Sequence, residues 1–477
     1  MMHFLQGRKL YLAVTGAVVL MALVLSGFAH GLSSKRYEQH RYETTVPMLS
    51  ITTTQETIPG ELIQDESGKS VGYTMSKDNL PYVTGRLETP DGASRDITIH
   101  VRGNSSRRFS KSSYRMNLIE NGDPLTGRKE ELLGMPEADE WVLYGPYLDK
   151  TLMRNYMWMN ISAQVLGWAP QVRFCELTLN GTYRGLYVLM ETIGVSEHKI
   201  SLHEYRPGDP VMSYMVHIET HTDEDVTIMP FSFYSKRLEP RKKYAISYPT
   251  RKNQTAAVQQ YIYEDLSEIE NAIFAANAAA DEDFYVDYLD EDSFVDYYIL
   301  QEFLAGSDTF MGSTYFYKDA RGKLHIGPVW DFNNVLDNYF TTLEAEGFLL
   351  SDRNYYGQLM KSERFVNRVI DRYRALRKGV LSDAYLERYV EDVDAFLGEA
   401  IDRNFNVWAD SLDYTKLPAH ERRTPSAGSG LTLQQINPSS HEEATQQMLT
   451  YARERGKWLD EHIESLRQYC NRGGAYR

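Results

Sequence analysis

The chain has 477 residues, a formal net charge of −15 and 42% hydrophobic residues. This length is enough for one large domain or two lobes with a sizeable core. The acidic balance argues against a general nucleic-acid binder, which needs a basic footprint. Cys175 and Cys470 are too few for a disulfide scaffold, although one bridge between them is compatible with the sequence.

The N-terminus predicts a membrane-targeting segment. Arg8 and Lys9 precede Leu10–Ala29, an uncharged run whose length suits a membrane-spanning helix. Gly27-Phe28-Ala29 also fits a small-x-small cleavage site, so residues 1–32 are predicted to be a signal anchor or a signal peptide. The length favours the anchor. The charges before the run favour a cytoplasmic N-terminus, and those after it weaken this preference, so the body is predicted to be membrane-anchored or secreted and extracytoplasmic.

The remainder divides into a polar linker, a strand-rich part and a helical part. Residues 33–45 form the linker, residues 46–250 alternate in the manner of strands, and residues 251–470 carry helical spacing. The predicted fold class is therefore α+β.

Local signals place several elements along the chain. Asn180-Gly181 predicts a hairpin, because this pair fits the type I′ turn between two strands. A helix is expected over residues 149–166, and Ser293 with Asp296 resembles a capping pair that opens another. Residues 386–400 predict one long helix.

Two aspartates carry the most informative pattern. Asp308 follows a predicted helix, and Asp331 follows the second strand of a predicted hairpin. In phosphoryl transfer one carboxylate orients and deprotonates the attacking hydroxyl, and another holds a metal ion against the phosphates. A chance pair of aspartates is common in a chain with 66 acidic residues, but this helix–Asp–hairpin–Asp order is not. It predicts a phosphoryl-transfer site.

Three further segments fit such a site less specifically. Residues 101–115 follow a strand with Gly, Asn, Ser and Arg, which fits either a phosphate-cradling turn or a basic surface loop. Asp149 precedes Lys150 and Arg154, and the spacing favours a helix cap with solvated charges. Glu191 closes an apolar strand, where it predicts either a lysine partner or a solvated strand end.

Other catalytic patterns do not occur in the sequence. The 12 histidines show no HExxH or other metal spacing, no GxSxG elbow is present, and neither cysteine has an evident base.

In order along the chain, these segments resemble the CotH kinase family, atypical protein-kinase-like proteins first known as spore-coat proteins. The similarity runs from about residue 50 to 466. The matching text is Arg102-Gly-Asn-Ser-Ser-Arg107, Lys111-Ser-Ser-Tyr114, Trp141-Val-Leu143, Tyr147-Leu-Asp-Lys-Thr-Leu-Met-Arg-Asn155, Asn180-Gly-Thr-Tyr-Arg-Gly-Leu-Tyr187, Glu191, Asp308, Tyr315-Phe-Tyr-Lys-Asp319 and Gly327-Pro-Val-Trp-Asp-Phe332.

The resemblance implies a two-lobed, protein-kinase-like fold that binds ATP with Mg²⁺. Asp308 would be the catalytic aspartate that activates an acceptor hydroxyl, and Asp331 the metal-binding aspartate. Lys111 is the best match for the lysine that contacts phosphate. Glu191 and Arg102 are further matches for the nucleotide site.

The chain departs from the family pattern at two places. Five residues after Asp308 the family usually has Asn, and here Ser313 stands. Where the family often reads Asp-Phe-Asp, this chain reads Asp331-Phe-Asn333. Both residues keep an oxygen for Mg²⁺ but bring less charge or a weaker ligand, and Mg²⁺ accepts few protein ligands.

The sequence therefore leaves three functions open. The first is a kinase acting on hydroxyls of surface or coat proteins. The second, favoured by Ser313 and Asn333, is a weak or inactive relative that binds nucleotide or acts as an adhesin or coat-type protein. The third keeps ATP but catalyses another transfer. The expected partners are ATP, a protein substrate and, through the N-terminal segment, a membrane, with no nucleic acid.

Overall fold

The computed structural model describes residues 45–64, 70–103, 105–219, 228–230, 243–276, 281–338 and 341–470. The chain divides into two compact units, Met1–Val46 and Pro47–Arg477, and the second is described below. The predicted anchor at Leu10–Ala29 lies outside the described residues. Within these ranges, no helix is long and apolar enough to cross a bilayer.

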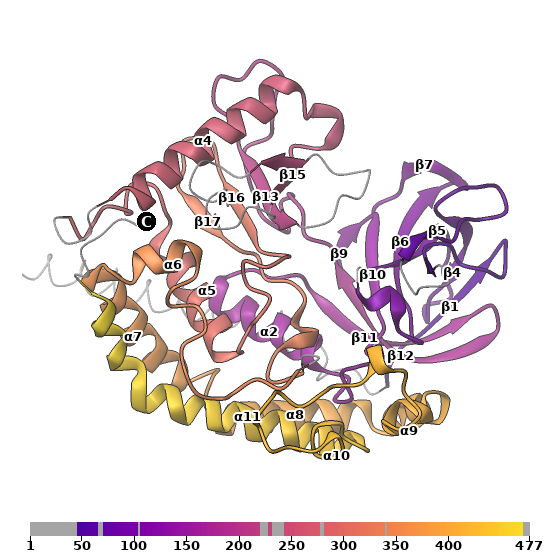
Figure 1. Cartoon of the computed structure of the whole chain (residues 1–477). Coiled ribbons are helices and arrows are strands. Elements are labelled where there is room, and N and C mark those ends of the chain that lie inside the picture. The colour runs from indigo at the N-terminus through magenta and orange to yellow at the C-terminus, as the bar shows by residue number, and fades with distance from the viewer. Residues whose placement is uncertain are drawn as a thin grey trace, which may run out of the picture. The chain divides into compact units, whose positions relative to one another are not determined.

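The strand-rich part forms a closed barrel (Figure 1). Its sheet runs in the order β10-β12-β11-β1-β4-β5-β6-β7, and β10 also pairs with β6, which closes the ring. All neighbouring pairs with a recorded register are antiparallel except β1 with β11. The strands are β1 (Met48–Thr53), β4 (Val83–Glu88), β5 (Ser94–Arg102), β6 (Ser113–Glu120), β7 (Asp123–Gly127), β10 (Glu140–Tyr144), β11 (Val172–Leu179) and β12 (Thr182–Glu191). Two small pairs accompany them, β2 (Leu62–Gln64) with β3 (Ser70–Tyr73) and β8 (Glu130–Leu132) with β9 (Met135–Ala138).

Alternation along β5 decides which residues fill the barrel and which leave it. Ile97, Ile99 and Val101 are buried in its apolar core. Because successive side chains of a strand point to opposite faces, His100 and Arg102 lie on the other face. The strand thus carries two basic side chains out of the core and toward the site described below.

The predicted hairpin at Asn180-Gly181 is confirmed. β11 and β12 pair antiparallel across it, and both turn residues have positive φ, 50° for Asn180 and 75° for Gly181. These are the angles that a type I′ turn requires, and Asn and Gly tolerate them best.

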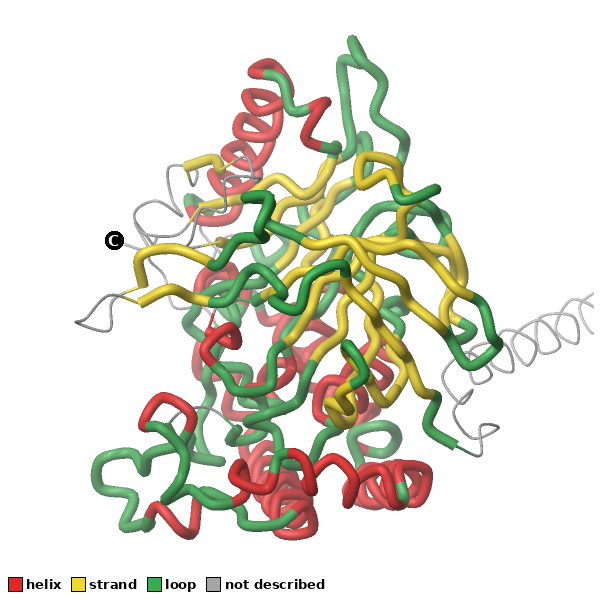
Figure 2. Tube along the Cα trace, turned by 90° about the vertical axis from the view of Figure 1, so that its right-hand side faces the viewer, coloured by secondary structure: helices red, strands yellow, loops and turns green. Residues whose placement is uncertain are grey.

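Helices make up most of the rest of the unit. In Figure 2 the strands gather in the upper half of the view and most helices lie below them. They are α2 (Arg154–Leu166), α4 (Ala256–Phe274), α5 (Glu291–Phe303), α6 (Asn354–Leu359), α7 (Glu363–Arg377), α8 (Asp383–Leu397), α9 (Glu399–Val407), α10 (Leu433–Ile436) and α11 (His441–His462). The α+β class with a β-rich N-terminal region and a helical C-terminal region is confirmed.

Three helix predictions were wrong in detail. The helix expected over residues 149–166 begins only at Arg154. α5 is capped by Asp290, whose carboxylate accepts from the backbone N–H of Ser293, while Asp296 pairs with Arg372 instead. The long helix expected over residues 386–400 is two helices, because the chain turns at Gly398 with φ 45° and ψ −127°.

A second sheet crosses the boundary that the sequence suggested at residue 250. It has the order β14-β15-β13-β16-β17. β13 (Tyr214–Glu219), β14 (Ile228–Pro230) and β15 (Lys243–Tyr248) come before the boundary, whereas β16 (Tyr315–Lys318) and β17 (Leu324–Ile326) form the predicted hairpin between the two aspartates. β13 pairs directly with β16, so strands from both parts support the hairpin.

Helix α9 joins the helical part to the barrel. The guanidinium of Arg403 binds both carboxylate oxygens of Glu176 on β11, at 2.9 and 2.8 Å. The Trp408 indole donates to the carbonyl of Arg184 on β12 at 2.9 Å. These contacts fix the position of the helical part relative to the barrel, next to the cavity described below.

Candidate functional site

A cavity of about 550 Å³ lies where the barrel meets the segments that carry the two aspartates. The barrel contributes Arg102 and His100 from β5 and Arg115 from β6 to the lining. Asp308 and Asp331 line the same cavity. Of the seven residues predicted for the site, the structure gathers five here: Arg102, Asp308, Ser313, Asp331 and Asn333.

Local turns place both aspartates at the cavity. Helix α5 ends at Phe303, and Asp308 opens a turn in which its carbonyl accepts from Met311 N at 2.8 Å. Asp331 follows the β16–β17 hairpin and adopts a left-handed backbone, with φ 59° and ψ 56°. Both residues are half-buried, so their carboxylates are desolvated in part but remain accessible from the cavity.

Two hydrogen bonds cross between the aspartate segments. Ser313, from the Asp308 segment, donates its hydroxyl to Asp331 Oδ2 at 3.0 Å. Asn334, from the Asp331 segment, donates its amide to Asp308 Oδ2 at 3.0 Å. Each segment therefore holds the carboxylate of the other, and a shift of either would move both.

Strained backbone gathers in the same segments. Ala305, Phe310, Ser313, Asp331 and Leu336 all have φ between 49° and 61°. A non-glycine residue held in such a region costs on the order of 1–3 kcal/mol and persists only where the surroundings over-determine it. The concentration of these residues around two half-buried carboxylates is typical of a functional site.

The barrel side of the lining, called the basic wall below, carries Arg102, Arg107 and Arg115 in an otherwise acidic protein. Arg102 lies with its guanidinium 5.7 Å from the centre of the Trp330 ring, and Arg107 lies 4.2 Å from that of Tyr73. Burial, and after it the charge of Arg115, lower the pKa of His100 to about 4, so this imidazole is neutral near pH 7. Guanidinium groups are the side chains best suited to phosphate oxygens.

The structure does not place Lys111 with the residues that line the cavity. Its ammonium is buried and donates to the carbonyl of Leu186 at 2.6 Å and to Asn404 Oδ1 at 2.7 Å. The rings of Tyr187 and Trp408 flank it at 4.9 and 6.0 Å. Burial lowers its pKa well below the usual range. Its two hydrogen bonds therefore link β12, which carries Leu186, to α9, which carries Asn404.

Glu191 also lies away from the cavity. It is fully buried at the end of β12, and its Oε2 accepts from the backbone N–H of Gln171 at 2.7 Å. The expectation of a solvated strand end is therefore wrong, because this strand end is covered.

The charged turn before α2 is buried as well, contrary to the expectation of solvated charges. Asp149, Lys150 and Arg154 are 1%, 6% and 4% exposed. The N-cap residue of α2 is Met153, so the prediction of Asp149 as the cap is wrong. Asp149 Oδ2 does accept from Arg154 N, the first helical N–H, at 2.9 Å, and its Oδ1 pairs with the Arg154 guanidinium at 2.5 Å. These charged groups form one buried network.

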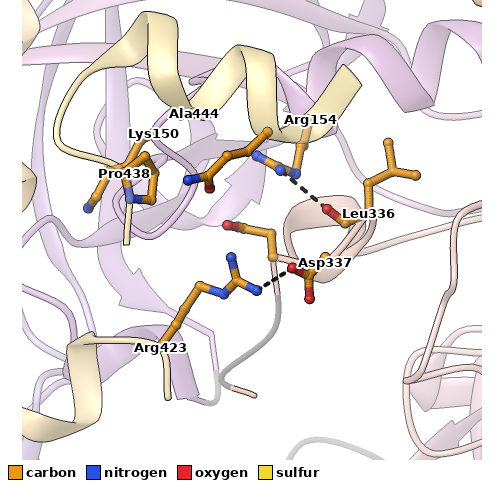
Figure 3. Close-up of a pocket in the computed structure, with 9 residues that line it drawn as sticks. Lys150, Arg154, Leu336, Asp337, Arg423, Pro438 and Ala444 are labelled. Atoms are coloured by element: carbon orange, nitrogen blue, oxygen red, sulfur yellow. Dashed lines mark hydrogen bonds and ion pairs between the residues drawn. The ribbon is translucent and has the colours of Figure 1, made fainter. Parts of the chain in front are cut away.

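This network supports the loop that follows Asp331. Arg154 donates to the carbonyls of Val335 and Leu336 at 3.1 and 3.4 Å. Asn155 Oδ1 accepts from Phe332 N at 2.9 Å. Figure 3 shows the small polar pocket behind the loop, of about 20 Å³, where Arg154 reaches Leu336 and Arg423 pairs with Asp337. The start of α2 thus fixes the loop that follows Asp331.

Sequence reasoning missed Asn334 and Asn155. Neither belongs to a pattern with a chemical signature, and both act through contacts that only the fold creates. The match of residues 147–155 to the family text was the available signal for Asn155.

Together the fold and the cavity define an α+β protein in which one cavity, between a β-barrel and a helical part, is lined by two carboxylates and three arginines. A model of the CotH kinase protein family matches residues 99–459, and the chain belongs to this family. It is also similar to the inner spore coat protein H of Bacillus subtilis (strain 168), with 23% identity over 326 residues, covering 63% of this chain and 82% of that protein. Family membership indicates a kinase-like or coat-type protein.

Proposed function

We propose that the protein is an ATP-dependent phosphotransferase with a two-lobed, kinase-like architecture, which moves the γ-phosphate of ATP to a hydroxyl of a surface or coat protein. The observation that carries the proposal is the cavity itself: Asp308 and Asp331, tied by crossed hydrogen bonds, line the same cavity as Arg102, Arg107 and Arg115. A polyanion bridged to carboxylates by a divalent cation would fit a cavity with this lining.

The donor set suits Mg²⁺. Asp331, Ser313 and Asn333 offer carboxylate, hydroxyl and amide oxygens, the hard ligands that this ion prefers. Among the residues that the structure describes, no group of three or more His, Cys, Asp or Glu forms a ready cation cage. Mg²⁺ commonly uses only one or two carboxylates, with substrate phosphates and water completing its shell. When bound, the ion would neutralise charge on the phosphates.

The chain's own groups then have distinct tasks. Asp308 accepts the proton of the acceptor hydroxyl as the oxygen attacks the γ-phosphorus, while the bond from that phosphorus to the β-phosphate oxygen breaks and ADP leaves. Arg102 and Arg107 hold phosphate oxygens and orient the chain of phosphates. The strained loops around both aspartates limit their movement, so that little reorganisation is needed during transfer.

The test is transfer of label from γ-labelled ATP with Mg²⁺ by the full-length chain. Asp308→Ala and Asp331→Ala should each abolish transfer, whereas Asp371→Ala, an exposed aspartate on α7, should leave it unchanged. Label that still transfers in both site variants would refute the assignment. Mass spectrometry of the product distinguishes a phosphate from another transferred group, which addresses the third function.

A binding-only role is the second candidate, and Ser313 and Asn333 favour it because they replace family ligands. The name of the Bacillus relative adds a coat association to this possibility. A protein of this kind would show no label transfer, with or without a rise in melting temperature on addition of ATP and Mg²⁺.

A further inference from the structure

Asn334 is the group that holds the proposed catalytic carboxylate. Its Nδ2 donates to Asp308 Oδ2 at 3.0 Å, across an interval of 26 residues. Within the described part of the chain, Oδ1 of Asp308 makes no hydrogen bond. One oxygen is therefore anchored and the other is left for a proton donor.

The anchor continues to Asn333. Nδ2 of Asn333 donates to Oδ1 of Asn334 at 2.8 Å, and the carbonyl of Asn333 accepts from Asn338 Nδ2 at 2.7 Å. Asn338 is buried, and Asn333 and Asn334 are half-buried. Three asparagines thus form a chain of amide hydrogen bonds that ends on Asp308.

The donor direction of this chain is fixed by its last member. An ionised carboxylate only accepts, so Asn334 must present its NH₂ to Asp308 and its oxygen to Asn333. Asn333 must then present its NH₂ to that oxygen. An aspartate at position 333 would place a second acceptor there, opposite the Asn334 oxygen.

We propose that Asn333 and Asn334 form a relay that orients the Asp308 carboxylate toward the acceptor hydroxyl, which makes Asn334 a positioning residue and explains why this chain carries Asn rather than Asp at position 333. This inference rests on the proposed phosphotransferase function. It gives Asn333 a task in addition to any contact with a metal ion.

The relay and a weakened metal ligand make opposite predictions for Asn333→Asp. If Asn333 is only a poor ligand for Mg²⁺, the family's usual aspartate should raise both the affinity for Mg²⁺ and kcat. If the relay orients Asp308, the same change should lower kcat by about 10-fold even where the Mg²⁺ dependence improves, because Asn334 loses its donor.

The direct test is Asn334→Leu, which keeps the size of the side chain and removes the amide. We expect kcat to fall by about 10- to 100-fold, the rate equivalent of a lost hydrogen bond to a charged group, with KM for ATP and the ATP-induced rise in melting temperature unchanged. Asn271→Ala, at an exposed position on α4, is the matched control and should behave as wild type.

The outcomes separate the relay from the proposed function. A transferring wild type whose Asn334→Leu variant keeps full kcat, or whose Asn333→Asp variant gains kcat, overturns the relay alone. If the wild type transfers nothing, the proposed function fails, and crystal structures of wild type and Asn334→Leu decide the relay. If the Asp308 carboxylate has the same orientation in wild type and in Asn334→Leu, the relay is overturned. If the carboxylate of the variant is rotated or occupies several orientations, the relay is supported.

Discussion

Replacement of Lys111 by Met separates a phosphate-contacting lysine from a structural one. The resemblance to the family assigns this side chain to phosphate, whereas the structure places its ammonium between the Leu186 carbonyl and Asn404. Met keeps the apolar stem between Tyr187 and Trp408 and removes the two hydrogen bonds.

The loss of unfolding free energy in Lys111→Met depends on which acceptors lose a hydrogen-bond donor. Asn404 Oδ1 keeps a hydrogen bond from Leu186 N at 3.0 Å, so only the Leu186 carbonyl loses the donor seen here. An unsatisfied buried acceptor costs about 1–3 kcal/mol. The loss is offset in part because the buried amine is removed as well. For a unit of this size the change in melting temperature should be only about 1–3 °C.

The pH dependence provides a second signature. Burial lowers the pKa of Lys111, so the unfolded chain binds more protons than the folded protein between the two pKa values. Stability from this group therefore rises with pH through that window. Lys111→Met should flatten this rise in denaturant midpoints measured from neutral to alkaline pH.

Calorimetric titration with ATP and Mg²⁺ then decides between the two roles. Affinity should stay within about twofold of wild type in Lys111→Met and should fall by about 10- to 100-fold in Arg102→Ala, which removes a charged contact from the cavity wall. The structural assignment would be refuted if Lys111→Met kept the melting temperature of wild type and the pH dependence of its denaturant midpoint but no longer bound ATP.

Three further predictions address the metal, the core and a second buried lysine. Asp331→Asn should remove the dependence of the ATP-induced melting shift on Mg²⁺, measured with and without chelator. Arg455→Leu should cost about 3–5 kcal/mol in denaturant unfolding, because it leaves the Glu302 carboxylate buried without its 2.5 Å ion pair. Burial raises the pKa of Glu302, so this cost should shrink as the pH falls, because the folded variant binds a proton more readily than the unfolded chain. Burial also lowers the pKa of Lys150 to about 7 from its ordinary 10.5, so Lys150→Met should reduce the gain in unfolding free energy between those pH values.

Local chemistry made parts of the fold predictable. The Asn180-Gly181 turn and the β16–β17 hairpin depend on residues that are neighbours in sequence, and both were found where expected. Closure of the barrel depends on pairing of β10 with β6 and of β1 with β11, which no local pattern specifies.

The site shows the same difference between features set by sequence neighbours and features set by long-range contacts. Asp308 and Asp331 were singled out by their order in the sequence, and both line the cavity. Lys111 was assigned to phosphate through the resemblance to the family, but its partner Asn404 lies 293 residues away on another element. The burial of Asp149 and Arg154 likewise depends on the loop after Asp331, which the sequence does not show to be near.

The two departures from the family pattern take on one physical meaning in this structure. Ser313 and Asn333 are both hydrogen-bond donors within the crossed network, Ser313 to the carboxylate of Asp331 and Asn333 to the amide that holds Asp308. Nucleotide affinity should depend mainly on the basic wall, whereas turnover should depend on the orientation of the two carboxylates. Different residues supply these two requirements, so Arg102→Ala should weaken ATP binding while Asn334→Leu should slow transfer. If each variant lowered both the affinity for ATP and kcat, this division of tasks would be contradicted.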